Sequence, residues 1–170
     1  GKVIEIASSS GLFVDKDHMA GLAALSSPYA FTPDAGEVVG EHNGAHYYTI
    51  GQRRGLNLGG FEQPLFVIGT DTQENIIYTG MGENHPGLYR SGLFLSTDAH
   101  WIREDLRLKT GESRKYLARI RYRQPLEACI LYQEPEGLYI IFDNPQRGVT
   151  PGQFAAWYQG EELIGSGVIN

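Results

Sequence analysis

A mainly β fold is predicted by three features of this 170-residue sequence. Short runs of aromatic and β-branched residues, such as Ile76-Ile77-Tyr78-Thr79, are typical of strands. Turn signals such as Asn43-Gly44 separate these runs, at the roughly eight- to twelve-residue spacing of small sandwiches and barrels. A hydrophobic content of 41% is that of an ordinary globular protein. We therefore expect two small β domains, residues 1–90 and residues 91–170, and the second should close into a barrel.

The first domain is expected to begin with a strand over residues 2–6. A loop-rich insertion follows at about residues 7–35, because runs of Ser, Gly and Pro interrupt any regular pattern there. A short helix over residues 17–25 is the one element predicted within it. A strand that starts at the first residue, with no Met before it, favours a fragment of a longer protein.

Two hairpins and a glycine-rich loop should complete the first domain. Strands over residues 37–42 and 45–50 flank the Asn43-Gly44 turn, and strands over residues 64–69 and 76–80 flank a polar turn. Between the hairpins, four glycines of residues 51–60 bracket two adjacent arginines and could present amides and guanidinium groups to an anion. Residues 83–89, with His85-Pro86-Gly87, resemble a linker.

The second domain is predicted to contain six strands and a long polar loop over residues 143–153. The strands are expected at residues 91–96, 117–123, 129–132, 138–142, 154–158 and 163–169.

One strand of the second domain alternates basic and apolar residues. Because strands have a period of two, Arg119, Arg121 and Arg123 should share one face, about 6.6 Å apart, while Ile120 and Tyr122 point inward. Such a row could contact successive phosphates of a nucleic acid. It could equally be a solvated face whose arginines pair with carboxylates on a neighbouring strand.

The charge distribution supports a local anion-binding surface. The chain has a formal net charge of −6, which argues against a general nucleic-acid binder. Residues 101–123, however, hold eight Lys or Arg against three acidic residues, a net charge of +5, which leaves about −11 on the rest. A specific anionic partner would use this local field.

Other classes of site find little support in the sequence. No apolar run approaches the roughly 18 residues of a membrane span, and no signal peptide is recognisable. The single cysteine, Cys129, lies in an apolar run, which is typical of a buried structural thiol in a reducing compartment. The five histidines lack metal-ligand spacing, so no metal site is expected.

Seven motifs occur in a fixed order from about residue 36 to the last residue. They are Gly40-Glu41-His42-Asn43-Gly44, Tyr48-Thr49-Ile50-Gly51-Gln52-Arg53-Arg54-Gly55-Leu56, His85-Pro86, Arg119-Ile120-Arg121-Tyr122-Arg123-Gln124, Phe142-Asp143-Asn144-Pro145, Val149-Thr150-Pro151-Gly152-Gln153 and Gly165-Ser166-Gly167-Val168-Ile169. In order and spacing these motifs resemble one family, the tRNA-specific 2-thiouridylases, formerly labelled tRNA (5-methylaminomethyl-2-thiouridylate) methyltransferases.

The resemblance implies a three-part enzyme, of which this chain is similar to the last two parts. They are a small central β domain and a C-terminal barrel resembling domain 2 of elongation factor Tu. The family's ATP site and both catalytic cysteines belong to the N-terminal part, and Cys129 matches neither cysteine. We therefore expect no catalytic residue and no cofactor in this chain, with ATP and a sulfur-donor protein acting on the full enzyme in the cytoplasm. The oligomeric state is left open.

The resemblance also implies the tRNA contacts. Arg121, Tyr122 and Gln153 stand where the family's barrel touches tRNA, although strand alternation would point Tyr122 inward. To these we add Arg119 and Arg123 from the same strand, and Gln52, Arg53 and Arg54 from the glycine-rich loop, as candidate tRNA-binding residues.

Two alternatives from other classes remain open at this point. One is an accessory β-barrel of a translation factor, and the other is a protein-interaction domain whose arginines bind acidic surfaces.

Overall fold

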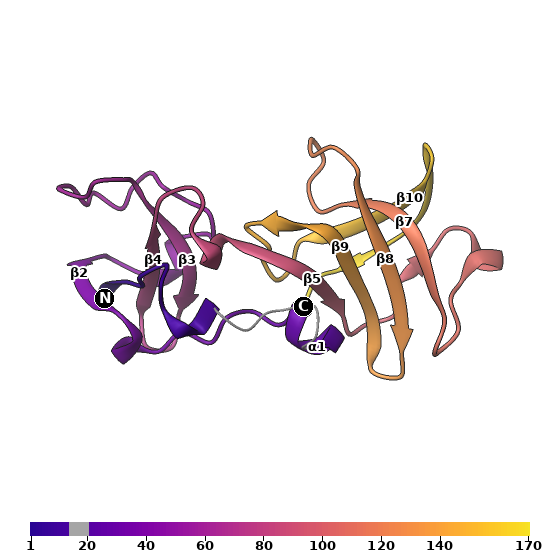
Figure 1. The fold of residues 1–170 in the computed structure, drawn as a ribbon, viewed down its shortest axis with the longest axis horizontal. Helices are drawn as coiled ribbons and strands as arrows, with labels where there is room; N and C mark the ends of the chain where they lie inside the picture. The colour runs from indigo at the N-terminus through magenta and orange to yellow at the C-terminus, as the bar shows by residue number, and fades with distance from the viewer. Residues whose placement is uncertain (14–20) are drawn as a thin grey trace. The chain divides into compact units, whose positions relative to one another are not determined.

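The computed structural model describes residues 1–13 and 21–170, and strands are its main regular structure (Figure 1). By their contacts the described residues form two compact units. The first unit holds residues 1–13 and 28–89, and the second holds residues 21–27 and 90–170. The predicted mainly β class is confirmed, and the short helix Gly21–Ser26 (α1) belongs to the second unit.

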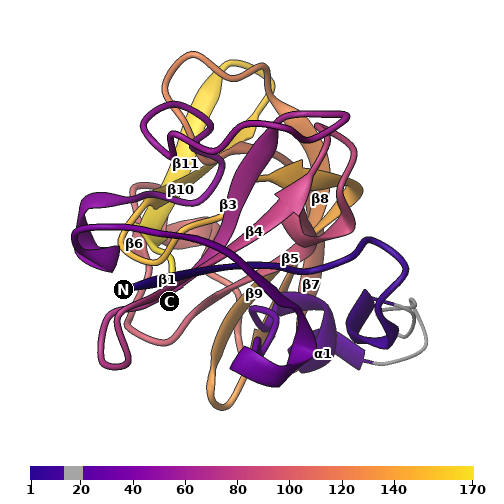
Figure 2. The ribbon, with the colours of Figure 1, turned by 90° about the vertical axis from the view of Figure 1, so that its left-hand side faces the viewer.

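The first unit is built on a four-stranded sheet with the order β2-β1-β4-β3. Figure 2 shows β3 and β4 of this sheet side by side. Its strands are β1 (Lys2–Glu5), β2 (Glu37–Glu41), β3 (Leu65–Asp71) and β4 (Ile76–Met81). Strand β1 pairs antiparallel with β2 and parallel with β4.

Both faces of β3 are covered, as its continuous apolar run predicts. Phe66 and Ile68 pack into a cluster with Ile4, while Leu65 and Val67 pack into a second cluster on the other face. The predicted hairpin of β3 and β4 is therefore confirmed, with antiparallel pairing from Leu65 to Asp71.

The predicted hairpin around Asn43-Gly44 is wrong, because its second strand does not form. Residues Ala45–Tyr47 make a 3-10 helix (η3) instead. The Asn75 side chain accepts a hydrogen bond from the Ala45 amide at 2.9 Å, and His42 Nδ1 accepts one from the Gly44 amide at 3.0 Å. The Gly44 and Ala45 amides therefore donate to side chains, and they are not available for hydrogen bonds to a neighbouring strand.

The remaining helical turns are short. They are η1 (Gly11–Phe13), η2 (Pro33–Ala35), η4 (Pro86–Leu88) and η5 (Glu104–Leu106). The helix predicted over residues 17–25 is described only from Gly21, since residues 14–20 lie outside the described part. Among the helices of the described residues, none has the length and apolar character needed to cross a membrane.

The second unit is a curled sheet with the strand order β5-β9-β8-β7-β10-β11-β6. Its strands are β5 (Tyr89–Leu95), β6 (His100–Trp101), β7 (Ser113–Arg119), β8 (Glu127–Glu134), β9 (Gly137–Arg147), β10 (Phe154–Gln159) and β11 (Glu162–Val168). Beyond β11, the Asn170 amide donates to the Phe94 carbonyl of β5 at 2.9 Å, so the chain end joins the two sides of the sheet.

The concave side of this sheet encloses one hydrophobic core. Trp157 of β10 is fully buried and meets Trp101 edge to face, with ring centroids 5.2 Å apart. Leu131 and Ile140 from β8 and β9 are also fully buried in this core. Helix α1 is tied to the unit by Arg90, whose guanidinium donates to the Ser26 carbonyl at 3.0 Å.

Two boundaries in the second unit differ from the prediction. Strand β9 extends to Arg147, so the polar loop predicted over residues 143–153 is wrong in its first half. Gln146, within this extension, is buried at 4% exposed, and its Nε2 donates to the Asn144 carbonyl at 2.9 Å. Strand β7 ends at Arg119, short of the predicted residue 123.

Two histidines hold the first unit together through the same pattern of hydrogen bonds. His85 Nδ1 accepts the Gly87 amide at 3.0 Å, and its Nε2 donates to the Ile6 carbonyl at 2.8 Å. His42 repeats this arrangement with the Gly44 amide and the Asn75 carbonyl. Both rings must therefore be neutral, and burial lowers the pKa of each below its usual value. The segment predicted as a linker thus contains a buried anchor.

We predict that acid destabilises the first unit through these histidines. Because the folded-state pKa is depressed, the unfolded chain binds protons more readily, so stability is complete above about pH 6.5 and falls as the pH drops towards the folded-state pKa. His85→Ala should cost about 1–3 kcal/mol at pH 8, since it leaves a buried carbonyl and amide without partners. Denaturant unfolding across this pH range measures both effects.

His46 provides the matched control. It is exposed and its ring lies against that of Tyr47, so His46→Ala should keep the loss of stability in acid that the wild type shows. A wild-type stability that is flat between pH 8 and pH 5 would contradict this account of His42 and His85.

Candidate nucleic-acid interface

A tight turn over residues 120–124 follows β7 and replaces the end of the predicted strand. The Gln124 side chain builds it. Its Oε1 accepts the Ile120 amide at 3.1 Å, its backbone amide donates to the Arg121 carbonyl at 3.1 Å, and its Nε2 donates to Gln146 Oε1. Since Gln146 is buried in β9, the turn is attached to the body of the sheet. We name residues 119–124 the basic turn.

The predicted row of three arginines on one strand face is therefore wrong. Only Arg119 lies in β7, and Ile120 is buried as predicted, at 3% exposed. Arg121 and Arg123 lie in the turn, where strand alternation no longer applies. The same change turns Tyr122 outward: its side chain is 85% exposed rather than packed in the core. A site on this turn can therefore use the Tyr122 ring.

Arg119 is held between two tyrosine rings. One guanidinium nitrogen donates to Tyr158 Oη at 3.0 Å, and the guanidinium carbon lies 5.2 Å from the Tyr158 ring centroid. The same carbon lies 5.6 Å from the Tyr122 ring centroid. Both distances are within the range of a cation–π interaction.

Arg121 reaches the loop that follows β9. Its Nη2 donates to the Gly148 carbonyl at 2.9 Å, and Thr150 Oγ1 donates to the same carbonyl at 3.1 Å. Partial burial lowers the pKa of Arg121, and the positive charge of Arg147 nearby lowers it further. An anion bound at Arg121 would offset both effects, because it stabilises the charged form of the guanidinium group.

Gln153 completes the same loop. Its Oε1 accepts the Thr150 amide at 3.0 Å, and its carbonyl accepts the Ile169 amide at 2.8 Å. The side-chain oxygen is thus occupied by the turn over residues 150–153, and the Nε2 of this half-buried residue is the group that can donate to a ligand. The structure brings Gln153 and Arg121 onto one connected set of hydrogen bonds through Gly148 and Thr150.

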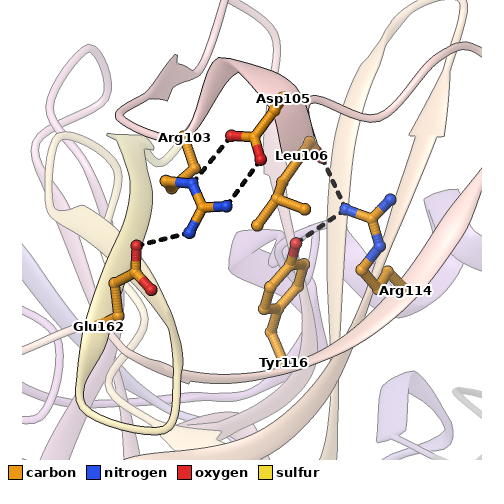
Figure 3. A network of polar contacts seen from close by, with 6 residues as sticks. All are labelled: Arg103, Asp105, Leu106, Arg114, Tyr116 and Glu162. Carbon is orange, nitrogen blue, oxygen red and sulfur yellow. Dashed lines mark hydrogen bonds and ion pairs between the residues drawn. The ribbon is translucent and has the colours of Figure 1, made fainter.

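Some arginines of this unit form ion pairs with carboxylates, and those of the basic turn do not. Arg103 pairs with Asp105 at 2.7 Å and Glu162 at 2.9 Å (Figure 3). Arg107 pairs with Glu104 at 2.8 Å, and these carboxylates raise the pKa of both guanidinium groups. Within the described residues no carboxylate pairs with Arg119, Arg121 or Arg123.

Fewer basic side chains of residues 101–123 are therefore available to a partner than the net charge of +5 suggests. Arg114 is also engaged internally, donating to the Leu106 carbonyl at 2.6 Å and to Tyr116 Oη at 2.9 Å (Figure 3). Apart from the exposed Lys109 and Lys115, the charge of this segment that is available to a partner lies on the basic turn. Arg123 is exposed there, and its side chain makes no hydrogen bond or ion pair with the described part of the chain.

The glycine-rich loop lies in the first unit and is closed by its own side chains. Gln52 Nε2 donates to the Arg54 carbonyl at 2.8 Å, and its Oε1 accepts the Thr49 amide at 3.1 Å, so this side chain shapes the loop. Gly55 adopts a φ of 87°, which an L-residue rarely takes. Arg53 and Arg54 are both exposed, and Arg53 borders a 640 Å³ hollow lined by residues 56–65.

Cys129 is buried on β8, 2% exposed, with its thiol donating to the Tyr116 carbonyl at 3.4 Å. Burial raises the pKa of this thiol to about 12, so it holds its proton at neutral pH. No group of three His, Cys, Asp or Glu residues within 1–13 and 21–170 is arranged to hold a metal ion.

Sequence reasoning missed two residues of this surface. Tyr158 and Arg147 come from β10 and β9, which the chain brings beside β7 and the basic turn. No motif singles them out. The alternation of β10 did hold a signal, because Trp157 and Ala155 point inward and so place Tyr158 outside, but only the strand pairing shows that Arg119 is its neighbour.

Two family models match the chain. One is described as "tRNA methyl transferase PRC-barrel domain" and matches residues 26–81. The other is described as "Aminomethyltransferase beta-barrel domain" and matches residues 91–169.

Curated relatives share one name, tRNA-specific 2-thiouridylase MnmA. The protein of Christiangramia forsetii is 48% identical over 100% of this chain and 45% of its own length. That of Flavobacterium johnsoniae is also 48% identical, over 99% of this chain and 42% of its own length. That of Chlamydia trachomatis is 47% identical over 80% of this chain and 37% of its own length. The chain thus spans less than half the length of these relatives.

We predict that Cys129 does not react with thiol reagents while the protein is folded. Although the residue borders a 480 Å³ hollow that is lined by residues of β7 to β10, its thiol is protonated and buried. A disulfide reagent at pH 8 should label it only at the rate of unfolding, and labelling should become rapid in denaturant. Rapid labelling of the native protein would contradict this description of the thiol.

Proposed function

Since this chain belongs to the family of tRNA-specific 2-thiouridylases, we propose that it is the tRNA-binding portion of such an enzyme. The observation that supports the proposal most is the positive charge of the basic turn. Three arginines without carboxylate partners among the described residues surround an exposed tyrosine, in a chain whose net charge is −6. On an acidic chain, such a local positive patch attracts a polyanion to this one site, while the rest of the surface repels it.

The binding chemistry follows from the groups on the basic turn. Arg121 and Arg123 would contact phosphates, since guanidinium groups pair with phosphate oxygens in a bidentate manner. Tyr122 would stack on an unpaired base, as aromatic side chains of RNA-binding proteins do, and Gln153 Nε2 would donate a hydrogen bond. The hydrogen bonds from Arg121 and Thr150 to Gly148 hold these groups in place before tRNA arrives.

The chemical step is proposed to lie elsewhere in the enzyme. In this proposal the parent replaces the C2 oxygen of the wobble uridine with sulfur, using ATP and a sulfur-donor protein in the cytoplasm. The buried, protonated thiol of Cys129 is unsuited to carry sulfur. The chain by itself would therefore bind tRNA without thiolating it. An accessory barrel of a translation factor fits less well, because the relatives also match the first unit.

Arg53 and Arg54 are proposed as a second, weaker contact. They are exposed on a loop whose shape is fixed by Gln52, but they belong to the first unit. In the complete enzyme this loop would face the catalytic domain and the tRNA.

We predict weak, salt-dependent tRNA binding by this chain. Each phosphate contact is worth on the order of 1 kcal/mol, so three arginines support a dissociation constant in the micromolar range or weaker. Arg121→Ala should weaken binding severalfold and reduce the slope of log affinity against log salt by about one, because one fewer counterion is released. Filter binding or fluorescence anisotropy across a salt series measures both quantities.

Arg103→Ala is the matched control, because Arg103 is committed to Asp105 and Glu162. It should leave affinity and slope within twofold of the wild-type values. Arg53→Ala with Arg54→Ala should reduce affinity less than Arg121→Ala does. Equal effects of Arg103→Ala and Arg121→Ala, or nanomolar binding by the wild type, would contradict the proposal.

A further inference from the structure

The outer face of β7 and β10 carries aromatic residues beside the basic turn. Ala155 and Trp157 of β10 are fully buried, so Phe154, Ala156 and Tyr158 point to the opposite side. The strand pairing sets Ala156 opposite Arg119. Phe154 is 64% exposed and directly follows Gln153.

Arg119 is fixed in the middle of this face. Its hydrogen bond to Tyr158 Oη and its contacts with the Tyr122 and Tyr158 rings leave the guanidinium little freedom. Fixing a long, flexible side chain costs conformational entropy, so an arginine restrained before binding loses less on contact with an anion. Tyr122 is nevertheless 85% exposed as a residue, which leaves its side chain available to a partner.

The charge on this face distinguishes between the possible partners. A face for docking another protein domain would need acidic groups opposite its arginines, whereas RNA provides phosphates and stackable bases together. Arg103 and Arg107 of the same unit already have carboxylate partners, and within the described residues the arginines of the basic turn have none. An unpaired RNA segment fits both properties of the face, its exposed rings and its positive charge.

We infer that Tyr122, Phe154, Arg119 and Tyr158 form one binding face for an unpaired segment of RNA. Bases stack on the Tyr122 and Phe154 rings, and Arg119 contacts a phosphate between them. Tyr158 is a positioning residue that holds Arg119 and need not touch the RNA. This inference rests on the proposed tRNA binding and adds the class of RNA that the face recognises.

The test compares an unpaired oligouridine strand with a fully paired RNA duplex, using the complete 170-residue chain. Tyr122→Ala and Phe154→Ala should each weaken binding of the unpaired strand by roughly tenfold, the usual effect of losing one stacked base, and should change duplex binding less than twofold. Tyr122→Phe keeps the ring and should restore the affinity. Tyr47→Ala, which removes another exposed tyrosine, is the control and should have no effect.

Two further measurements test the individual roles. A 2-aminopurine in the unpaired strand should lose fluorescence on binding the wild type and not on binding Tyr122→Ala, because stacking quenches it. Tyr158→Phe removes the hydroxyl and should weaken binding a few-fold, but should have no added effect in an Arg119→Ala background, since it acts through Arg119.

The outcomes separate this inference from the proposed function. If the wild type binds tRNA while the ring variants bind the unpaired strand normally, the face is wrong and tRNA binding stands. If the wild type binds neither tRNA nor the unpaired strand, both are overturned. Additive effects of Tyr158→Phe and Arg119→Ala would overturn the positioning role, and equal losses on both RNAs would overturn the specificity for unpaired strands.

Discussion

The hydrogen bonds of one side chain, Gln124, determine how this molecule presents its positive charge. By accepting the Ile120 amide and donating to buried Gln146, Gln124 ends β7 at Arg119 and ties the basic turn to β9. Without this turn, continued alternation would place Tyr122 in the core and the three arginines along a strand. With it, Tyr122 is exposed, Arg121 reaches the loop that contains Gln153, and Arg119 lies between two rings. The candidate interface depends on this geometry.

Electrostatics then assign different roles to arginines that are close in sequence. Arg103 and Arg107 are neutralised by neighbouring carboxylates on the exposed surface, where such pairs add little stability. Arg121 lies near Arg147, and the repulsion contributes to the lowered pKa of Arg121. A carboxylate beside Arg121 would relieve this repulsion permanently, whereas a phosphate would relieve it only when bound. The uncompensated charge of the basic turn is therefore better suited to binding than to folding.

Much of the fold could be predicted from the sequence, because apolar runs and turn residues mark β3, β4, β8, β10 and β11 directly. The errors occurred where side chains compete for backbone hydrogen bonds. Asn75 and His42 convert the segment after Asn43-Gly44 into a 3-10 helix, and Gln124 ends β7 at Arg119. Motif resemblance indicated Arg121, Tyr122 and Gln153. Tyr158 and Arg147 required strand pairing across distant parts of the sequence, which local patterns do not contain.

The central claim is that the basic turn and the strands beside it, in the second unit, are where tRNA binds. Hydrogen–deuterium exchange of the 170-residue chain, with and without tRNA, tests this claim most directly because it reports on every peptide at once. The account predicts that tRNA slows exchange over residues 119–124 and 147–158, with a smaller effect over residues 51–60 and none near Arg103 and Arg107. Protection confined to the first unit, or centred on residues 103–107, would contradict it.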